Sequence, residues 1–129
     1  MLAYLKIMIL SLAVVHATSF ATQNPACSTD LTGGVDDEIV QQSTRAVNNM
    51  GATVTMATTK SCGSVKVSID RDPPAQAPPT GFEATSDMIL TNLNALNKKC
   101  EYGSVYFNSQ GSDSIILKLT TEATTSPPC

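Results

Sequence analysis

The sequence lacks the residues on which much hydrolytic and zinc chemistry depends. Its one histidine, His16, lies in an N-terminal leader that we expect to be removed, and there is no tryptophan. A chain without histidine has no Ser-His-Asp triad, no Cys-His protease pair and no histidine-containing zinc site. No Asn-x-Ser/Thr sequon is present, so we expect no N-linked glycan. These absences predict a protein that is not an enzyme and that holds no cofactor and no metal ion.

Long apolar runs are also scarce. Residues 7–15 form the one extended apolar stretch, whereas a bilayer span takes about 20 residues. Lys6 precedes this stretch and small residues such as Ala17 follow it, which is the pattern of a secretory signal peptide. We predict a signal peptide over residues 1–21, with cleavage after Ala17 as the alternative. The remaining residues 22–129 fit a single domain, which we expect to be secreted and extracellular, with no membrane span.

Basic residues are few and scattered. The formal net charge is −3, and it becomes −4 once Lys6 is removed with the leader. Nucleic acids and anionic membranes are bound by clustered Lys and Arg, so we expect neither as a partner. Lys98 and Lys99 are the only adjacent bases. We interpret them as cations in the last turn of a helix, where they interact favourably with the negative end of the helix dipole. The alternative is a dibasic site for proteolytic processing.

Two segments carry the apolar spacing of an amphipathic helix. Apolar residues recur on one helical face over residues 36–50 and again over residues 82–99. Thr80 and Glu83 have the spacing of a capping box at the start of the second helix. The acidic residues 36–38 fall in the first turn of the first helix. We interpret them as capping groups that complement the helix dipole; an acidic metal or acid/base cluster is the alternative.

Four further segments alternate between apolar and polar residues, as half-buried strands do. We predict strands over residues 52–57, 64–70, 104–108 and 114–120. Residues 58–63 would join the first two strands in a hairpin. Because the alternation is one-sided, the sheet has one buried face, and both helices must cover it. The predicted fold class is therefore α+β: a two-layer sandwich in the order αββαββ, with a four-stranded antiparallel sheet and two antiparallel helices on one face.

All of the cysteines follow the leader, at Cys27, Cys62, Cys100 and Cys129. A secreted chain meets an oxidising compartment, and no pair has the C-x-x-C spacing of a zinc site, so we predict two disulfides. The direction of the predicted elements brings all four cysteines to one end of the sheet. The three pairings stay open. We favour Cys27 with Cys129 or Cys100, because a Cys62–Cys100 bridge requires close neighbouring strands to keep the Cα atoms within about 7 Å.

The opposite end of the sheet is where we look first for a recognition surface. It carries a proline-rich segment, and the candidate recognition residues in it are Pro73, Pro74, Gln76, Pro78 and Pro79. Proline stiffens such a segment and lowers the ordering cost of binding. A spacer that merely crosses the end of the sheet is the simpler interpretation.

Two other features near this end have both a functional and a structural interpretation. Asp70 and Asp72 form a D-x-D motif, a spacing by which some sugar-transferring enzymes hold a divalent cation. No nucleotide-binding pattern accompanies it, so we favour carboxylates at the end of a strand. Ile116 is an apolar residue on the predicted polar face. We interpret it as an isolated surface hydrophobe rather than a contact residue.

The four cysteines, together with the pattern of elements over residues 36–120, resemble small secreted proteins of filamentous fungi. Within these, the order of elements resembles the killer-toxin-like fold, first known from a virally encoded toxin of smut fungi and adopted by many plant-pathogen effectors. The resemblance involves no specific motif, so no functional residue transfers. It implies a secreted, non-enzymatic effector or toxin-like virulence protein, a monomer or weak oligomer that binds a host or competitor protein. The alternative is a secreted inhibitor or small-ligand-binding module, with the proline-rich loop entering a partner's cleft.

Overall fold

The computed structural model describes residues 24–72, 82–109, 114–122 and 129. The predicted signal peptide and the candidate recognition residues of the proline-rich loop lie outside the described residues. In chain order the elements are β1 (Ala26–Asp30), α2 (Asp37–Asn48), β2 (Thr53–Val54), β3 (Thr58–Cys62), β4 (Val65–Arg71), β5 (Ala84–Thr85), α3 (Ser86–Lys99), β6 (Cys100–Asn108) and β7 (Ser114–Thr121). Neither of these helices combines the length and the apolar character needed to cross a membrane.

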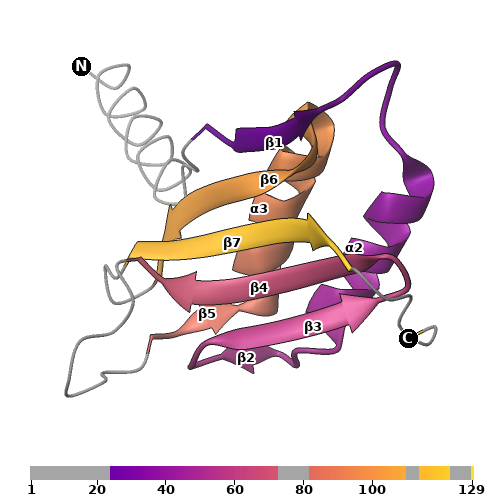
Figure 1. Ribbon diagram of the computed structural model, residues 1–129. Helices are drawn as coiled ribbons and strands as arrows, with labels where there is room; N and C mark the ends of the chain where they lie inside the picture. The colour runs from indigo at the N-terminus through magenta and orange to yellow at the C-terminus, as the bar shows by residue number, and fades with distance from the viewer. Residues whose placement is uncertain (1–23, 73–81, 110–113, 123–128) are drawn as a thin grey trace, which may run out of the picture.

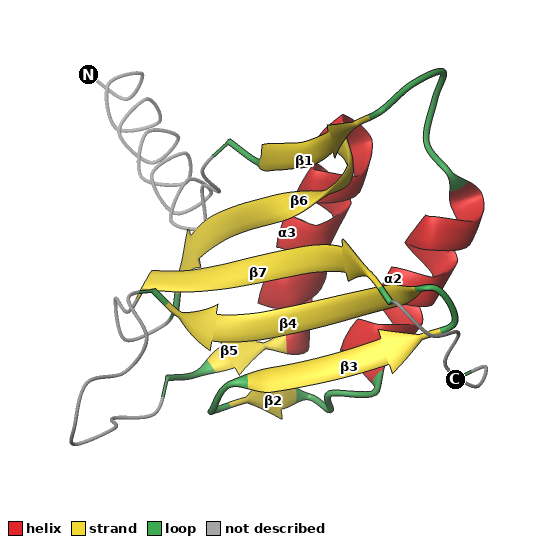
Figure 2. Ribbon diagram, in the orientation of Figure 1, coloured by secondary structure: helices red, strands yellow, loops and turns green. Residues whose placement is uncertain are grey.

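The two helices pack on one face of an antiparallel sheet, which confirms the predicted α+β class and the shared helical face. The strands of the main sheet lie in the order β1-β6-β7-β4-β3. Figure 1 shows α2 and α3 side by side behind this sheet, running in roughly opposite directions, and Figure 2 shows the same two layers by element type. The sheet has five strands rather than the four predicted. A separate two-stranded ribbon, β2 with β5, accompanies it.

One-sided alternation along the central strands builds the core. Val67 and Ile69 of β4 lie opposite Leu119 and Leu117 of β7. All four side chains are almost fully buried beneath the helices. The helices contribute apolar side chains from their inner faces, among them Val47, Leu93 and Leu96. This is the pattern that the sequence predicted for β4 and β7, because each of these strands is covered on one face only.

Both helices begin at a capping side chain. Asp36 accepts hydrogen bonds from the backbone N–H groups of Glu38 and Ile39, at 2.9 and 3.4 Å, ahead of α2. The predicted start of the second helix near residue 82 is wrong, because α3 begins at Ser86 with Thr85 as its cap. Residues before it are extended in β5, and the backbone N–H of Phe82 donates to the carbonyl of Thr55 at 3.2 Å. Pairing with the β2 segment therefore extends the backbone where the helix was expected to begin, and Thr80 of the predicted capping box lies outside the described residues.

The first predicted hairpin is wrong in its position. We expected a strand over residues 52–57 and a connection over residues 58–63, but Thr58–Cys62 is itself strand β3 and pairs with β4. Only Thr53 and Val54 of the expected strand are extended, and they belong to the separate ribbon. Strand β3 is polar because it lies at the edge of the sheet, where most of its side chains stay in contact with solvent. Alternation is therefore absent from its sequence.

The turn of the β3–β4 hairpin is fastened to α2. Gly63 has a φ of +58°, a conformation that favours glycine, and Ser64 follows it. Gln42 of α2 accepts hydrogen bonds at its side-chain oxygen from the Ser64 backbone N–H, at 3.3 Å, and from the Ser64 hydroxyl, at 3.0 Å. The helix layer thus fixes the hairpin at the end of the sheet where the disulfides lie.

Two disulfides link the chain ends to this end of the sheet. Cys27 bridges Cys100 and Cys62 bridges Cys129, with Cα separations of 5.2 and 5.3 Å. The first pairing is one of the two that we favoured for Cys27. Both bridges lie toward the same end, since Cys27 pairs in register with Gly103 of β6 and Cys62 closes the β3–β4 hairpin. The first bridge also secures β1, an edge strand that the sequence did not predict because its residues are mostly exposed and do not alternate.

Gly103 allows β1 to approach β6 closely, and we predict that Gly103→Ala separates the two strands. A Cβ atom at this position would collide with the carbonyl oxygen of Ala26 and press on the Cα of Cys27. We expect the free energy of unfolding to fall by about 1–3 kcal/mol, measured by urea titration with the disulfides intact.

Ser104→Ala on the same strand is the control, because that side chain is half-exposed on the other face. It should change the free energy of unfolding by less than about 0.5 kcal/mol. Equal stability of the Gly103→Ala variant and the parent would show that β1 does not need this close approach.

Candidate binding site on the open face of the sheet

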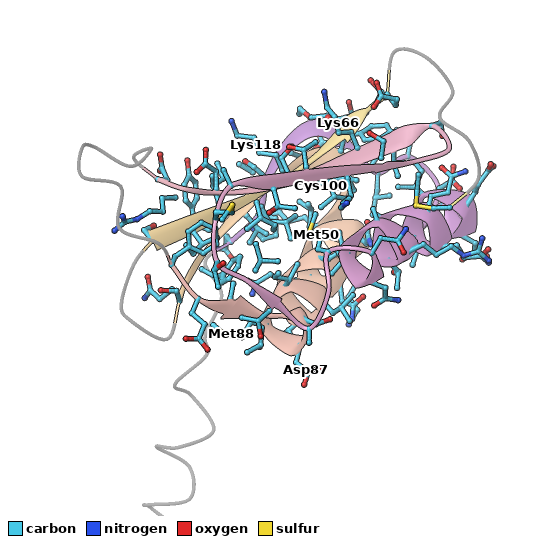
Figure 3. All side chains as sticks on the ribbon, turned by 90° about the horizontal axis from the view of Figure 1, so that it is seen from below. Met50, Lys66, Asp87, Met88, Cys100 and Lys118 are labelled. Carbon is cyan, nitrogen blue, oxygen red and sulfur yellow. A yellow bond between two sulfur atoms is a disulfide. The ribbon has the colours of Figure 1, made fainter. Side chains whose placement is uncertain are left out.

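The face of the main sheet opposite the helices is open among the described residues, and it is polar. Figure 3 shows Lys66 and Lys118 on this side, with Met50 and Met88 on the helix side. Alternation along the strands places hydroxyl groups between the charged ones. The hydroxyl-bearing residues on this face include Thr59, Ser61, Ser68, Ser104, Tyr106, Ser114 and Thr120.

A shallow hollow of about 360 Å³ lies on this open face, at the end of the sheet away from the disulfides. It spans the start of β3, the end of β4 and the facing parts of β6 and β7. Its lining residues are Ala57, Thr58, Thr59, Ser68, Ile69, Asp70, Arg71, Asp72, Tyr106, Ile116 and Lys118. The hollow therefore draws on the four neighbouring strands β3, β4, β7 and β6. It exists only when the β3–β4 and β6–β7 hairpins lie side by side.

Strand register arranges the lining in two rows across the sheet. In the first row Tyr106 of β6 lies opposite Ile116 of β7, which in turn lies opposite Asp70 of β4. These three side chains are half-buried. Directly opposite residues on one face have Cβ atoms about 5 Å apart, so Tyr106 and Ile116 form one continuous apolar surface. Ile116 is thus not the isolated surface hydrophobe that we expected, since it has an aromatic neighbour inside a hollow.

The second row is made of hydroxyl groups and one ammonium group. Lys118 of β7 lies opposite Ser68 of β4 and, on its other side, opposite Ser104 of β6, which is outside the lining. Ser68 lies opposite Thr59 of β3, and their hydroxyl oxygens are 3.1 Å apart, within hydrogen-bonding distance. Lys118 is exposed. This row presents groups that donate and groups that accept hydrogen bonds along one edge of the apolar surface.

The D-x-D motif lies at the rim of the hollow. Asp70 accepts a hydrogen bond from the backbone N–H of Arg71 at 2.7 Å, and the backbone N–H of Asp72 donates to the carbonyl of Ser114 at 2.9 Å. Both aspartates and Arg71 line the hollow. Within the described part of the chain, no group of three or more His, Cys, Asp or Glu side chains is placed to hold a metal ion. The motif contributes two acidic side chains to the lining, beside the two basic ones of Arg71 and Lys118.

The acidic residues 36–38 lie apart from the hollow and have the structural role that we favoured. Asp36 is the cap of α2, and Asp37 and Glu38 lie in its first turn. Burial raises the pKa of Tyr102, and the neighbouring carboxylates of Glu101, Asp36 and Glu38 raise it further. No residue of this group lines the hollow.

The remaining candidate features lie in two places. Lys98 and Lys99 are exposed in the last turn of α3, where their charge complements the helix dipole. Proteolytic processing at this pair stays a prediction. The proline-rich loop lies outside the described residues, but the chain enters it from Asp72 at the rim of the hollow. Sequence reasoning did not single out Tyr106, Ser68 or Lys118. Their alternation with core residues assigned them to the polar face, but their grouping depends on register across β4 and β7.

No protein family, curated protein or solved structure matches this chain.

We predict that the side chains that line the hollow contribute little to stability. Two neighbouring residues of β7 test this, because their substitution should lower the free energy of unfolding by very different amounts. Ile116→Ala removes one cross-strand contact on the open face and should lower the free energy of unfolding by about 1 kcal/mol or less. Leu117→Ala leaves a cavity in the core, because Leu117 is fully buried, and should cost about 2–5 kcal/mol. Urea unfolding of the two variants measures the difference. Similar losses would mean that Ile116 is part of the core.

Proposed function

We propose that this protein is a secreted, non-enzymatic effector or toxin-like module that acts by binding a host or competitor target through the open face of its sheet. The observation that carries the proposal is the hollow beside Tyr106 and Ile116, on the one face that the helices leave uncovered. The signal-peptide pattern and the two disulfides support export to an oxidising compartment.

The chemistry of the lining supports binding rather than catalysis. Histidine is the most frequent base beside a hydroxyl nucleophile, and residues 22–129 contain none. Thr59 and Ser68, the paired hydroxyls of the hollow, have each other as partners. Tyr106 and Ile116 are half-buried and have polar groups around them. This resembles a recognition surface, in which an aromatic anchor at the centre supplies contact area and a polar rim supplies hydrogen bonds.

The killer-toxin-like resemblance remains part of the proposal at the level of architecture. Two helices over one face of an antiparallel sheet are compatible with the sandwich that the resemblance implies. Strand β1 and the β2–β5 ribbon add to the predicted order of elements. We therefore take from the resemblance the expectation of a secreted binding protein, and we take the binding residues from the hollow.

Binding to intact target cells tests this proposal. Fluorescently labelled protein is applied to plant tissue and to competing fungi, and saturable cell-surface binding is quantified. Because Tyr106 is the aromatic anchor, we expect Tyr106→Ser to weaken binding at least about tenfold. Lys118→Glu should also weaken it.

Lys98→Glu makes the same charge change on the exposed side of α3 and is the matched control, with no expected effect on binding. Saturable binding to neither kind of cell, or binding that none of the open-face substitutions changes, would contradict the proposed function.

A secreted inhibitor or small-ligand-binding module is the second candidate, favoured by the size of the hollow. Its volume of about 360 Å³ falls at the lower end of the range of about 300–1,000 Å³ typical of ligand sites. In the inhibitor form of this proposal, the proline-rich loop that follows Asp72 enters the cleft of a partner.

The inhibitor form predicts that replacing Pro73–Pro79 with a short Gly-Ser linker abolishes target binding, since the loop itself makes the contact. A cooperative thermal unfolding transition first shows that the loop variant and the Tyr106→Ser variant are folded. The binding of both variants to the same cells is then measured in parallel. Retained affinity in the loop variant, with loss in Tyr106→Ser, would reject the inhibitor form and leave the open face as the binding surface.

A further inference from the structure

The hollow has a balanced set of charges, and this restricts the ligands that suit it. Asp70 and Asp72 contribute two acidic side chains, and Arg71 and Lys118 contribute two basic ones. A strongly anionic ligand would be placed beside the two carboxylates, and a strongly cationic one beside the guanidinium and ammonium groups. Like charges brought together in this way cost affinity. The balance favours a ligand that is polar but carries no net charge.

The hollow also offers an apolar surface of limited width. Tyr106 and Ile116 lie side by side, and each is half-buried, so their exposed parts form a small platform rather than a deep pocket. A tyrosine combines an apolar ring face with a hydroxyl that can bond at its edge. Such a platform suits a ligand with an apolar face of about one ring and polar groups around its perimeter.

The surroundings of the platform match that perimeter. The hydroxyls of Thr59 and Ser68 share one hydrogen bond, which leaves one O–H donor and several lone pairs for a ligand. The carboxylate of Asp70 accepts, and the ammonium of Lys118 donates. A sugar hydroxyl also donates and accepts at once, so a mixed set of this kind can satisfy several of them. Beyond the hollow the same face continues with Lys66 and Thr120, which lie opposite each other on β4 and β7, and with Ser61 of β3, whose hydroxyl donates to the carboxylate of Glu122. Polar contacts are therefore available along the sheet for more than one ring.

We propose that the hollow binds a neutral oligosaccharide, with one sugar ring packed on Tyr106 and Ile116 and its hydroxyls bonded by Ser68, Asp70 and Lys118. This inference rests on the proposed function and specifies the target as a glycan on a cell surface. The neighbouring sugar rings of the oligosaccharide lie along the hydroxyl-bearing rows of the open face.

Nuclear magnetic resonance titration of the secreted, disulfide-bonded protein tests the inference. The probes are neutral oligomers of glucose, of mannose and of N-acetylglucosamine, and the charged comparison is oligogalacturonate. We expect at least one neutral oligomer to shift backbone amide resonances of β4, β6 and β7 around the hollow, with a Kd of about 1 mM or tighter. Tyr106→Ser should raise that Kd at least about tenfold.

A matched pair of lysine variants locates the site on the face. Lys118→Ala removes a lining side chain and should weaken binding, whereas Lys98→Ala removes an exposed lysine of α3, away from the open face, and should not. Absence of shifts with every neutral oligomer, shifts away from the hollow, or a preference for oligogalacturonate would overturn the inference.

The cell assay separates this result from the proposed function. Binding that survives enzymatic removal of cell-surface glycans, and still depends on Tyr106, would overturn the sugar ligand while retaining a protein target. Binding that is lost with the glycans, and competed by the same free oligomer that shifts the amide resonances, supports both.

Discussion

The pairing of β4 with β7 is the contact on which the rest of the structure depends. Seven residue pairs, from Val65 with Thr121 to Arg71 with Ile115, join the β3–β4 hairpin to the β6–β7 hairpin. An isolated hairpin is marginally stable in water, because it cannot bury an apolar face alone. Joined along this seam, the two hairpins present a continuous apolar surface that α2 and α3 cover. The core and the open face are the two sides of this one pairing.

The same register creates the candidate site. Asp70 is brought to Ile116, and Ser68 to Lys118, because these pairs alternate with the core pairs of the same two strands. A slip of one residue would turn the polar side chains into the helix layer, so burial of the core fixes the register strongly. The grouping of side chains in the hollow is therefore a consequence of core packing and needs no separate stabilising contact. Substitutions on the open face can change the chemistry of the hollow while the core keeps the fold.

Sequence reasoning was reliable where burial is one-sided and failed where burial is slight. Clean alternation in β4 and β7, and helical spacing in α2, predicted elements close to those observed. Strands β1 and β3 escaped prediction because both are edge strands with largely exposed side chains. The start of α3 was misplaced because Phe82 is buried through its pairing with a segment distant in sequence. The hollow could not be predicted for a similar reason. Tyr106 and Asp70 are assigned to one row only when the register of β7 with β4 and with β6 is known.

Both edges of the main sheet are poorly suited to pairing with a strand of another molecule. Strand β1 is short, its register against β6 shifts near Thr29, and a disulfide holds it in place, all of which make it a poor template for another strand. On the other edge, Lys60 of β3 lies opposite Val67 and therefore on the core side of the sheet. A charged side chain in that position would be buried by an added strand, which disfavours edge-to-edge association. With one face under the helices and both edges protected, the open face is the part of the described sheet that the fold leaves uncovered.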